Sequence, residues 1–210
     1  MAKTPLKAEY VVVTADNRLD LVRNGSVDLD CETTSVTLAR RESVDFSLLT
    51  FATGATIMVR KVTATRELKA GETKVIGVIS GSTAETTLHR LIAERSVPAE
   101  IILFTTYDTA RTALEAGQID SFFADREILV GMRDASKNPD AFLISEDLLT
   151  YEPYAIALRL NQDRLRLAVD RVIAGLYRSG DIAPIFARWF PGSEPSFLLK
   201  AMYRLGAIPE

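Results

Sequence analysis

A double arginine follows three hydroxyl residues in the stretch TTSVTLARRESVDFS, residues 33–47. An arginine side chain offers a planar fork of N–H donors that matches a carboxylate, and the hydroxyls of Thr33 and Ser35 can donate beside it. At the start of an ordinary helix the same arginine would simply face solvent. Arg40 and Arg41 point to different sides of a helix, and their spacing leaves open which of the two faces a ligand.

A second set of candidate donors lies in SGSTAE, residues 80–85, which follows an apolar strand-like run and opens a helical pattern. Free backbone N–H groups and the helix dipole at such a turn favour an anion, and Ser82 and Thr83 can donate to it. The two hydroxyls can equally serve the helix itself, because Glu85 has the three-residue spacing of a capping box with Ser82.

An acidic residue, Asp125, stands between the strand-like run 119–124 and the next helical pattern. A carboxylate at the carboxyl end of a strand can face a cleft and accept an ammonium group. N-capping of the following helix is the alternative, since aspartate is a preferred N-cap residue.

The composition excludes several chemistries. The sequence has one histidine, His89, and one cysteine, Cys31, which excludes a His/Cys zinc site. It also lacks the glycine motifs of nucleotide sites and the nucleophile elbow of hydrolases, whereas acid catalysis by a carboxylate stays open. We expect His89 on a helix surface and Cys31 buried in a strand.

Charge and hydropathy indicate the class of protein. The formal net charge of -3 and the pI of about 5.4 give no sign of a nucleic-acid partner, and the hydrophobic content of 47% predicts a packed core. No run approaches the ~20 apolar residues of a membrane helix. The first ten residues, MAKTPLKAEY, lack the apolar region of a signal peptide.

The elements that must position these side chains alternate along the chain. Short apolar runs rich in β-branched residues predict strands, and amphipathic runs predict helices; glycines then stand where helix C-caps need a left-handed residue. An alternation of this kind predicts an α/β fold with largely parallel sheets. The predicted strands are 10–13, 27–31, 73–79, 100–104, 119–124 and 141–144, the helices are 18–23, 83–95, 109–116, 126–136 and 162–178, and the capping glycines are Gly25, Gly117 and Gly180.

Two further strand-like runs, residues 53–60 and 154–159, bracket a self-contained alternation of strands and helices. A chain that enters a second domain by one extended strand and leaves it by another makes a two-lobed protein with a hinge. The ligand is then expected in the cleft, facing the carboxyl ends of the strands.

The motifs also carry a resemblance to a known family. In order along the chain they are Asn17-Arg18, NGSVD (24–28), residues 33–47, VISGSTAE (78–85), ALEAGQIDSF (113–122) and Trp189-Phe190. From about Ala8 to the WF pair or beyond, the chain resembles a type II periplasmic solute-binding protein of the polar amino-acid ABC transporter class.

The resemblance implies an α/β, two-lobed fold. Lobe 1 would comprise residues 1–55 and 154–210, and lobe 2 residues 56–153. It further implies a periplasmic, non-enzymatic protein without metal or cofactor, whose partners are an amino acid and an ABC-transporter permease.

The family's site residues fall on particular positions of this chain. By resemblance, Arg40 holds the ligand α-carboxylate with help from Ser35 and Thr33. Thr83, with Ser82 beside it, matches the carboxylate donor of the second lobe. Asp125 matches the acidic residue that binds the α-ammonium group.

The side-chain end of the site resembles the glutamate/aspartate branch of the family. There Arg18 would bind a side-chain carboxylate, and Tyr107 would supply a hydroxyl or a flat wall. Ala15 stands where that branch offers a serine, a departure that removes one donor.

The chain also departs from the family at its start, because the family's first strand and helix have no counterpart before Ala8. We therefore expect an N-terminally truncated first lobe with an exposed strand edge, and a homodimer or swapped assembly that covers it. Two other functions remain open on this fold: a cyclohexadienyl or arogenate dehydratase, and a ligand-sensing domain.

Overall fold

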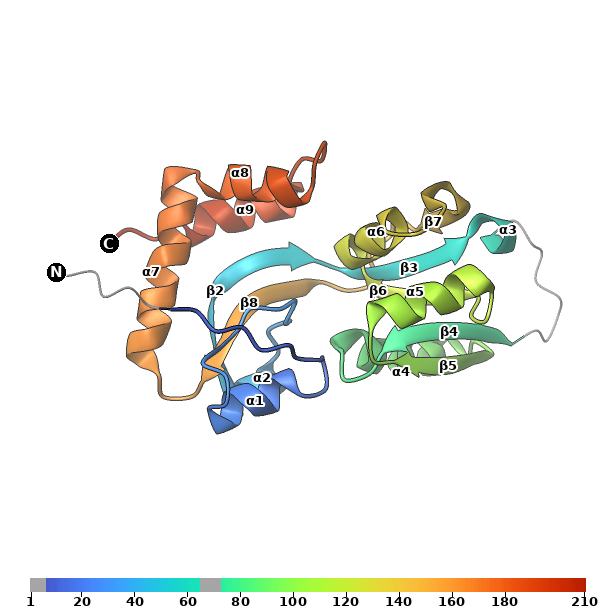
Figure 1. Cartoon of the computed structure of the whole chain (residues 1–210), viewed down its shortest axis with the longest axis horizontal. Coiled ribbons are helices and arrows are strands. Elements are labelled where there is room, and N and C mark those ends of the chain that lie inside the picture. Colours follow the sequence, from blue (N-terminus) through green and yellow to red (C-terminus); the bar gives the residue numbers. More distant parts are fainter. Residues whose placement is uncertain (1–6, 65–72) are drawn as a thin grey trace.

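The computed structural model describes residues 7–64 and 73–210. In this part of the chain two lobes lie end to end, each built on its own β-sheet (Figure 1). The sheets have the strand orders β1-β8-β2 and β5-β4-β6-β3-β7. The expected two-lobed α/β architecture is therefore confirmed.

The three-stranded sheet of lobe 1 is antiparallel and carries helices on both sides (Figure 1). Its core is formed where α1 packs on the sheet, by Val22, Val44, Phe46, Ala155 and Ala157. The strands are β1 (Leu29–Asp30), β2 (Val44–Thr53) and β8 (Glu152–Arg159), and the helices are α1 (Arg18–Asn24), α2 (Leu38–Arg41), α7 (Asp163–Ser179), α8 (Ile182–Trp189) and α9 (Phe197–Gly206).

The five-stranded sheet of lobe 2 buries both of its faces, as neighbouring residues show. Phe122 packs into one apolar cluster with helices α5 and α6, and Phe123 packs into another with helix α4, as strand alternation requires. The strands are β3 (Ala55–Arg60), β4 (Lys74–Ile79), β5 (Ala99–Phe104), β6 (Ser121–Asp125) and β7 (Phe142–Ile144), and the helices are α3 (Lys61–Ala64), α4 (Thr83–Arg95), α5 (Tyr107–Ala116), α6 (Arg126–Asp134) and the 3-10 turn Pro139–Ala141.

The lobes are joined where β2 and β8 lie side by side, with Thr53 opposite Glu152. Beyond this point Gly54 leads from β2 into β3. A Cβ at Gly54 would lie 2.1 Å from the Thr150 carbonyl oxygen, so the two crossing chains approach closely only because this residue is glycine. The predicted lobe boundaries at 55/56 and 153/154 stay a prediction.

The helix predictions and the later strand predictions are confirmed to within a few residues, and Gly25, Gly117 and Gly180 cap their helices at φ 79°, 75° and 80°. His89 is exposed on α4, as expected. The predicted strand 10–13 is wrong: Tyr10 and Val12 are 94% and 97% exposed and belong to no strand. A β-branched run becomes a strand only where a neighbour takes up its N–H and C=O groups, and these residues pair with none of the described strands.

Two more predictions are corrected near the site. The strand expected at 27–31 shrinks to β1, and Cys31 is exposed. The chain leaves the sheet after Asp30, whose carboxylate accepts from the Glu32 N–H and from the Thr34 hydroxyl, so the strand alternation that predicted a buried cysteine ends there.

The sheets are also less parallel than expected. Among the described strands, only β4–β5 and β4–β6 pair in parallel. The strands that cross between the lobes, β3 and β8, run antiparallel to their neighbours because they carry the chain into lobe 2 and back.

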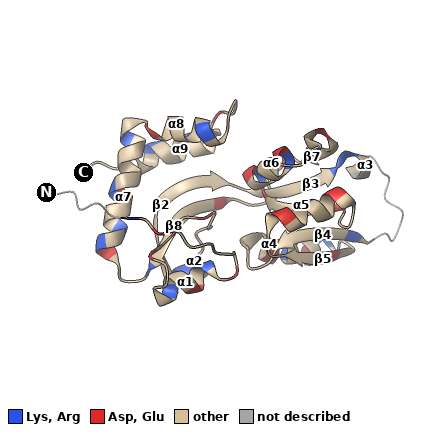
Figure 2. Ribbon diagram, viewed as in Figure 1, with Lys and Arg blue, Asp and Glu red and all other residues tan. Residues whose placement is uncertain are grey.

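Charged residues of both signs are interspersed over both lobes (Figure 2). None of the described helices is long and apolar enough to cross a membrane.

Candidate functional site

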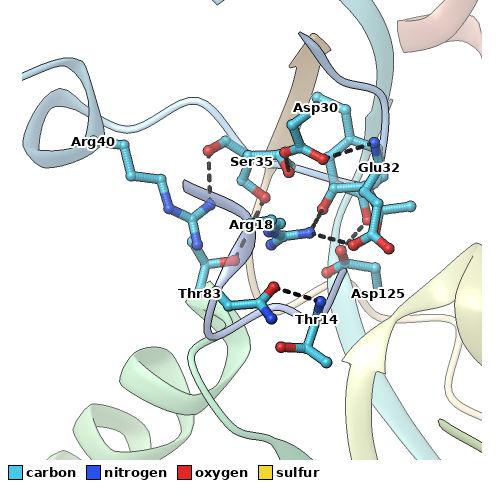
Figure 3. A network of polar contacts seen from close by, with 12 residues as sticks. Thr14, Arg18, Asp30, Glu32, Ser35, Arg40, Thr83 and Asp125 are labelled. Atoms are coloured by element: carbon cyan, nitrogen blue, oxygen red, sulfur yellow. Dashed lines mark hydrogen bonds and ion pairs between the residues drawn. The ribbon is translucent and has the colours of Figure 1, made fainter. Parts of the chain in front are cut away.

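Arg40 and Arg41 lie on the short helix α2 and point in different directions. Thr37 is the N-cap of helix α2, and its hydroxyl accepts the Arg40 N–H at 3.1 Å. The Arg40 Nη1 donates to the Ser35 carbonyl at 2.8 Å (Figure 3). Arg41 instead lies over the Phe46 ring and 3.6 Å from Asp45.

The Arg40 guanidinium is partly enclosed. It lines a cavity of about 580 Å³ that extends to the start of helix α4 in lobe 2. Burial and the nearby Arg18 lower the Arg40 pKa, while the carboxylates of Glu152 and Asp30 act in the opposite direction. An arginine stays charged under these conditions, so this cavity has one cationic wall.

A chain of hydroxyl groups connects the lobes beside Arg40. The Thr83 hydroxyl, in the first turn of α4, donates to the Glu152 carboxylate at 3.0 Å. The Ser35 hydroxyl lies 3.4 Å from the same Thr83 oxygen. Thr83 therefore occupies the meeting point of three segments, as the two-lobe interpretation requires.

Arg18 is the first residue of α1, and its side chain is 5% exposed. Its Nη1 donates to Glu32 at 3.2 Å and to the Thr33 carbonyl at 3.4 Å (Figure 3). Its Nε is buried without a hydrogen-bond partner. A buried guanidinium N–H without an acceptor is costly, so Arg18 retains a donor for a ligand or a water molecule.

Asp125 ends β6 and occupies the N-cap position of α6, but its side chain makes no capping bond. One carboxylate oxygen accepts the Tyr154 hydroxyl, and the other, Oδ1, is buried without a partner. Burial raises the pKa of Asp125 to about 6, although the hydrogen bond from Tyr154 opposes this shift. The carboxylate therefore has unused capacity to accept a hydrogen bond.

Ser82 and Tyr107 have clear structural roles. The Ser82 hydroxyl caps α4 by accepting the Glu85 N–H at 3.2 Å, and it donates to the Ile79 carbonyl at 2.7 Å. Ser82 is thus the predicted N-cap, but the Glu85 carboxylate accepts the Gly81 N–H and not the Ser82 N–H that a capping box requires. Tyr107 begins α5, and burial raises its pKa to about 12, which keeps its hydroxyl protonated.

The candidate residues gather around two adjoining cavities. Thr83 and Ser82 line both, whereas Arg40 lines only the larger one. The smaller cavity measures about 20 Å³, room for roughly one water molecule. The smaller cavity is therefore too small for an amino acid. The candidate residues that line the smaller cavity are Arg18, Thr33, Ser82, Thr83, Tyr107 and Asp125.

Sequence reasoning missed three polar residues of this region: Glu32, Glu152 and Tyr154. Glu152 and Tyr154 are separated by one residue at the start of β8 and are 6% and 5% exposed. The pattern E-P-Y at the beginning of an apolar strand places both side chains on one face. This spacing of two polar residues is the sequence pattern that could have identified Glu152 and Tyr154 as site residues.

The chain matches the family model of bacterial extracellular solute-binding proteins, family 3, over residues 1–192, and therefore belongs to that family. It is 28% identical to an L-glutamate/L-aspartate-binding protein of Pseudomonas aeruginosa, over 88% of this chain and 61% of the relative. It is 29% identical to a glutamate/aspartate import solute-binding protein of Salmonella typhimurium, over 97% of this chain and 67% of the relative.

Solved structures agree on the fold. An ancestral arginine-binding protein bound to arginine superposes with a TM-score of 0.78 at 23% identity, over 88% of this chain and 81% of that one. A substrate-binding protein of a Streptococcus pneumoniae ABC uptake transporter, with bound histidine, gives 0.77 at 21% identity, over 88% of this chain and 76% of that one. The chain thus spans roughly three fifths to four fifths of the proteins to which it is compared.

Proposed function

We propose that this protein is the extracytoplasmic, periplasmic solute-binding component of an amino-acid ABC transporter and delivers its ligand to a permease. One observation carries the proposal. The Arg18 guanidinium from lobe 1 and the Asp125 carboxylate from lobe 2, which has an unpartnered oxygen, line the same small cavity, and the Arg40 guanidinium lines the larger cavity that adjoins it. A site for a zwitterionic amino acid needs both: a cation for the carboxylate of the ligand and an anion for its ammonium group.

The amino acid would contact both lobes. Its α-carboxylate would take hydrogen bonds from Arg40, Ser35 and Thr83, and its ammonium group would donate to Asp125. A ligand shifts an open/closed equilibrium only through its differential affinity for the two states. Contacts from opposite lobes supply that difference, because they exist together only when the lobes are closed.

The side chain of the ligand is proposed to be acidic and to contact Arg18, with Thr33 and Tyr107 beside it. The buried, unpartnered Nε of Arg18 supports an acceptor at this position, and the two relatives named above bind glutamate or aspartate by their names. Glu32 already offsets part of the Arg18 charge. An amide side chain such as that of glutamine is therefore the principal competitor, and the chain is also 29% identical to a glutamine-binding protein of Bacillus subtilis.

The proposal is tested by a thermal-shift screen of the twenty amino acids. We expect glutamate, aspartate or glutamine to raise the unfolding temperature most, because binding to the folded state alone stabilises it by mass action. If no amino acid raises it, the proposed function is wrong.

A dehydratase activity is the second candidate, because the carboxyl group of Asp125 has a pKa of about 6 and can carry a proton near neutral pH. Incubation with prephenate or arogenate tests it. Release of phenylpyruvate or phenylalanine would favour the enzyme over the transporter component.

A homodimer is proposed for the free edge of lobe 1. Among the described strands β1 pairs only with β8, and the apolar side chains of Tyr10 and Val12, which precede α1 in the chain, are exposed. A second copy could pair with this edge. Light scattering that shows a monomer of 23.1 kDa across the micromolar range would contradict this part of the proposal.

A further inference from the structure

Two residues of β8 contact the lobe 2 groups that the proposed function assigns to the ligand. Glu152 and Tyr154 lie on one face of the strand where it leaves the hinge. Both side chains are buried. Each side chain forms a hydrogen bond with lobe 2: Glu152 accepts from Thr83, and Tyr154 donates to Asp125.

Tyr154 donates a hydrogen bond to Asp125, as an ammonium group of a ligand would. Its hydroxyl donates a hydrogen bond to one oxygen of the Asp125 carboxylate. Among the described residues no lysine or arginine is ion-paired with Asp125, and its second oxygen has no partner. The tyrosine hydroxyl is thus the only side-chain donor that the described structure gives to this carboxylate.

Glu152 accepts the hydrogen bond from Thr83 that a ligand carboxylate would accept. A threonine hydroxyl has one hydrogen to donate, and Thr83 donates it to Glu152. While that bond persists, Thr83 can accept from Ser35 but cannot donate to a second acceptor. A ligand carboxylate near Thr83 would also lie close to the Glu152 carboxylate, and like charges at short distance disfavour each other.

We propose that Glu152 and Tyr154 act as internal substitutes for the ligand's carboxylate and ammonium groups, and that they set the affinity for amino acids by competing with them. The inference rests on the proposed function of the same site. The observed affinity is then the difference between the contacts that the ligand makes and those that it displaces. Removing a substitute should tighten binding, whereas removing an ordinary site residue would weaken it.

The test is calorimetric titration of L-glutamate and of L-glutamine into the whole chain at pH 8, where Asp125 is ionised. The variants are Tyr154→Phe, Glu152→Gln and the double variant. Tyr177→Phe is the matched control, because it also loses one buried tyrosine hydroxyl. That hydroxyl donates to the Leu49 carbonyl over 2.7 Å and has no contact with the candidate site residues. We expect Tyr154→Phe to bind about three- to tenfold more tightly than wild type, the equivalent of one displaced hydrogen bond. Glu152→Gln should also bind more tightly, because it removes the like charge near the ligand carboxylate, although its amide oxygen can still accept from Thr83. Tyr177→Phe should bind like wild type.

Unchanged or weaker binding by both Tyr154→Phe and Glu152→Gln, with wild-type binding intact, overturns the competition while leaving the proposed function standing. Failure of the wild type to bind either amino acid overturns both.

A second measurement needs no variant of the site. The tyrosine ultraviolet absorption of wild type and of Tyr177→Phe should change on saturation with the ligand, because Tyr154 loses its buried carboxylate acceptor. A spectrum that stays the same at saturation contradicts the displacement.

Discussion

The two halves of the candidate site differ in how many hydrogen bonds the protein itself provides to their charged side chains. In lobe 1, Arg18 and Arg40 both donate to acceptors within the lobe, Glu32 and the Thr33 and Ser35 carbonyls. In lobe 2, Asp125 has one donor and a buried oxygen without a partner. The cationic half is thus positioned in advance by three hydrogen bonds and the anionic half by one, and the Arg18 Nε and the Asp125 Oδ1 are left for a ligand to satisfy. An unsatisfied buried group costs more than a satisfied one contributes.

The largest expected effect removes the cation that we assign to the α-carboxylate. Arg40→Ala should weaken amino-acid binding by at least about 100-fold, because charge-assisted hydrogen bonds contribute about 1.5–3 kcal/mol each. Arg41→Ala is the matched control, since Arg41 faces Phe46 and Asp45. Isothermal titration calorimetry measures both, and equal losses would assign the wrong arginine to the site.

Asp125→Asn tests the anionic half and separates binding from stability. Binding should weaken by roughly 100- to 5,000-fold, since removing one partner of a buried charge pair typically costs about 3–5 kcal/mol. Stability should rise at pH 7 by up to about 3 kcal/mol, because burial holds the Asp125 pKa at about 6 rather than 3.8. A denaturant titration that finds the variant less stable would contradict the assigned cost of burial.

Because of the raised Asp125 pKa, stability and ligand affinity should depend on pH in opposite directions. The folded state holds the Asp125 proton more tightly than the unfolded state, so the stability due to this group is full below about pH 4 and is lost as the pH rises through about 6. Ligand affinity should move the other way and fall about tenfold per pH unit below about pH 6, because an ammonium group needs the ionised carboxylate. A flat affinity between pH 5 and pH 8 would exclude Asp125 as the ammonium partner.

Arg18 sharpens the comparison at the side-chain end. Arg18→Ala should weaken L-glutamate binding about tenfold or more and L-glutamine binding less, because only the acid gains a charge-assisted bond. Arg23→Ala, on the exposed face of the same helix, is the control. Calorimetry with both ligands measures the ratio, and equal losses for glutamate and glutamine would argue against an acidic ligand.

The smallest effect concerns contact between the lobes. Gly81 has φ 72°, and a Cβ there would lie 2.4 Å from an Asp16 carboxylate oxygen. Gly81→Ala should displace Asp16, break its hydrogen bond from Ser80 and weaken binding about two- to tenfold. Gly180→Ala has the same left-handed strain, at φ 80°, with open space around it. If both variants bind equally well in calorimetry, lobe contact at Gly81 is irrelevant to binding.

Sequence patterns predicted lobe 2 far better than lobe 1. In lobe 2 the strands β4, β5 and β6 are each followed by a helix that packs on the sheet, and α4 was predicted to the residue. In lobe 1 the outcome depended on neighbours that no local pattern reveals. Tyr10 and Val12 have strand-like types and pair with no described strand, and Cys31 follows a strand of only two residues.

The site shows the same division. Residue types and the family resemblance selected Arg40, Asp125 and Thr83, because their chemistry is visible in the sequence. Glu152 and Tyr154 were not selected, since their importance comes from register: the pairing of Thr53 with Glu152 brings β8 across from lobe 2. Pairing between residues a hundred positions apart is not a local property of the chain.

The central claim is that an amino acid is held by its carboxylate in lobe 1 and by its ammonium group in lobe 2. One calorimetric series tests it most directly, using L-glutamate, its α-carboxamide and N-acetyl-L-glutamate. The account predicts that L-glutamate binds and that each derivative binds at least about 100-fold more weakly, because each lacks one of the two charged groups. A derivative that binds as tightly as L-glutamate would contradict it.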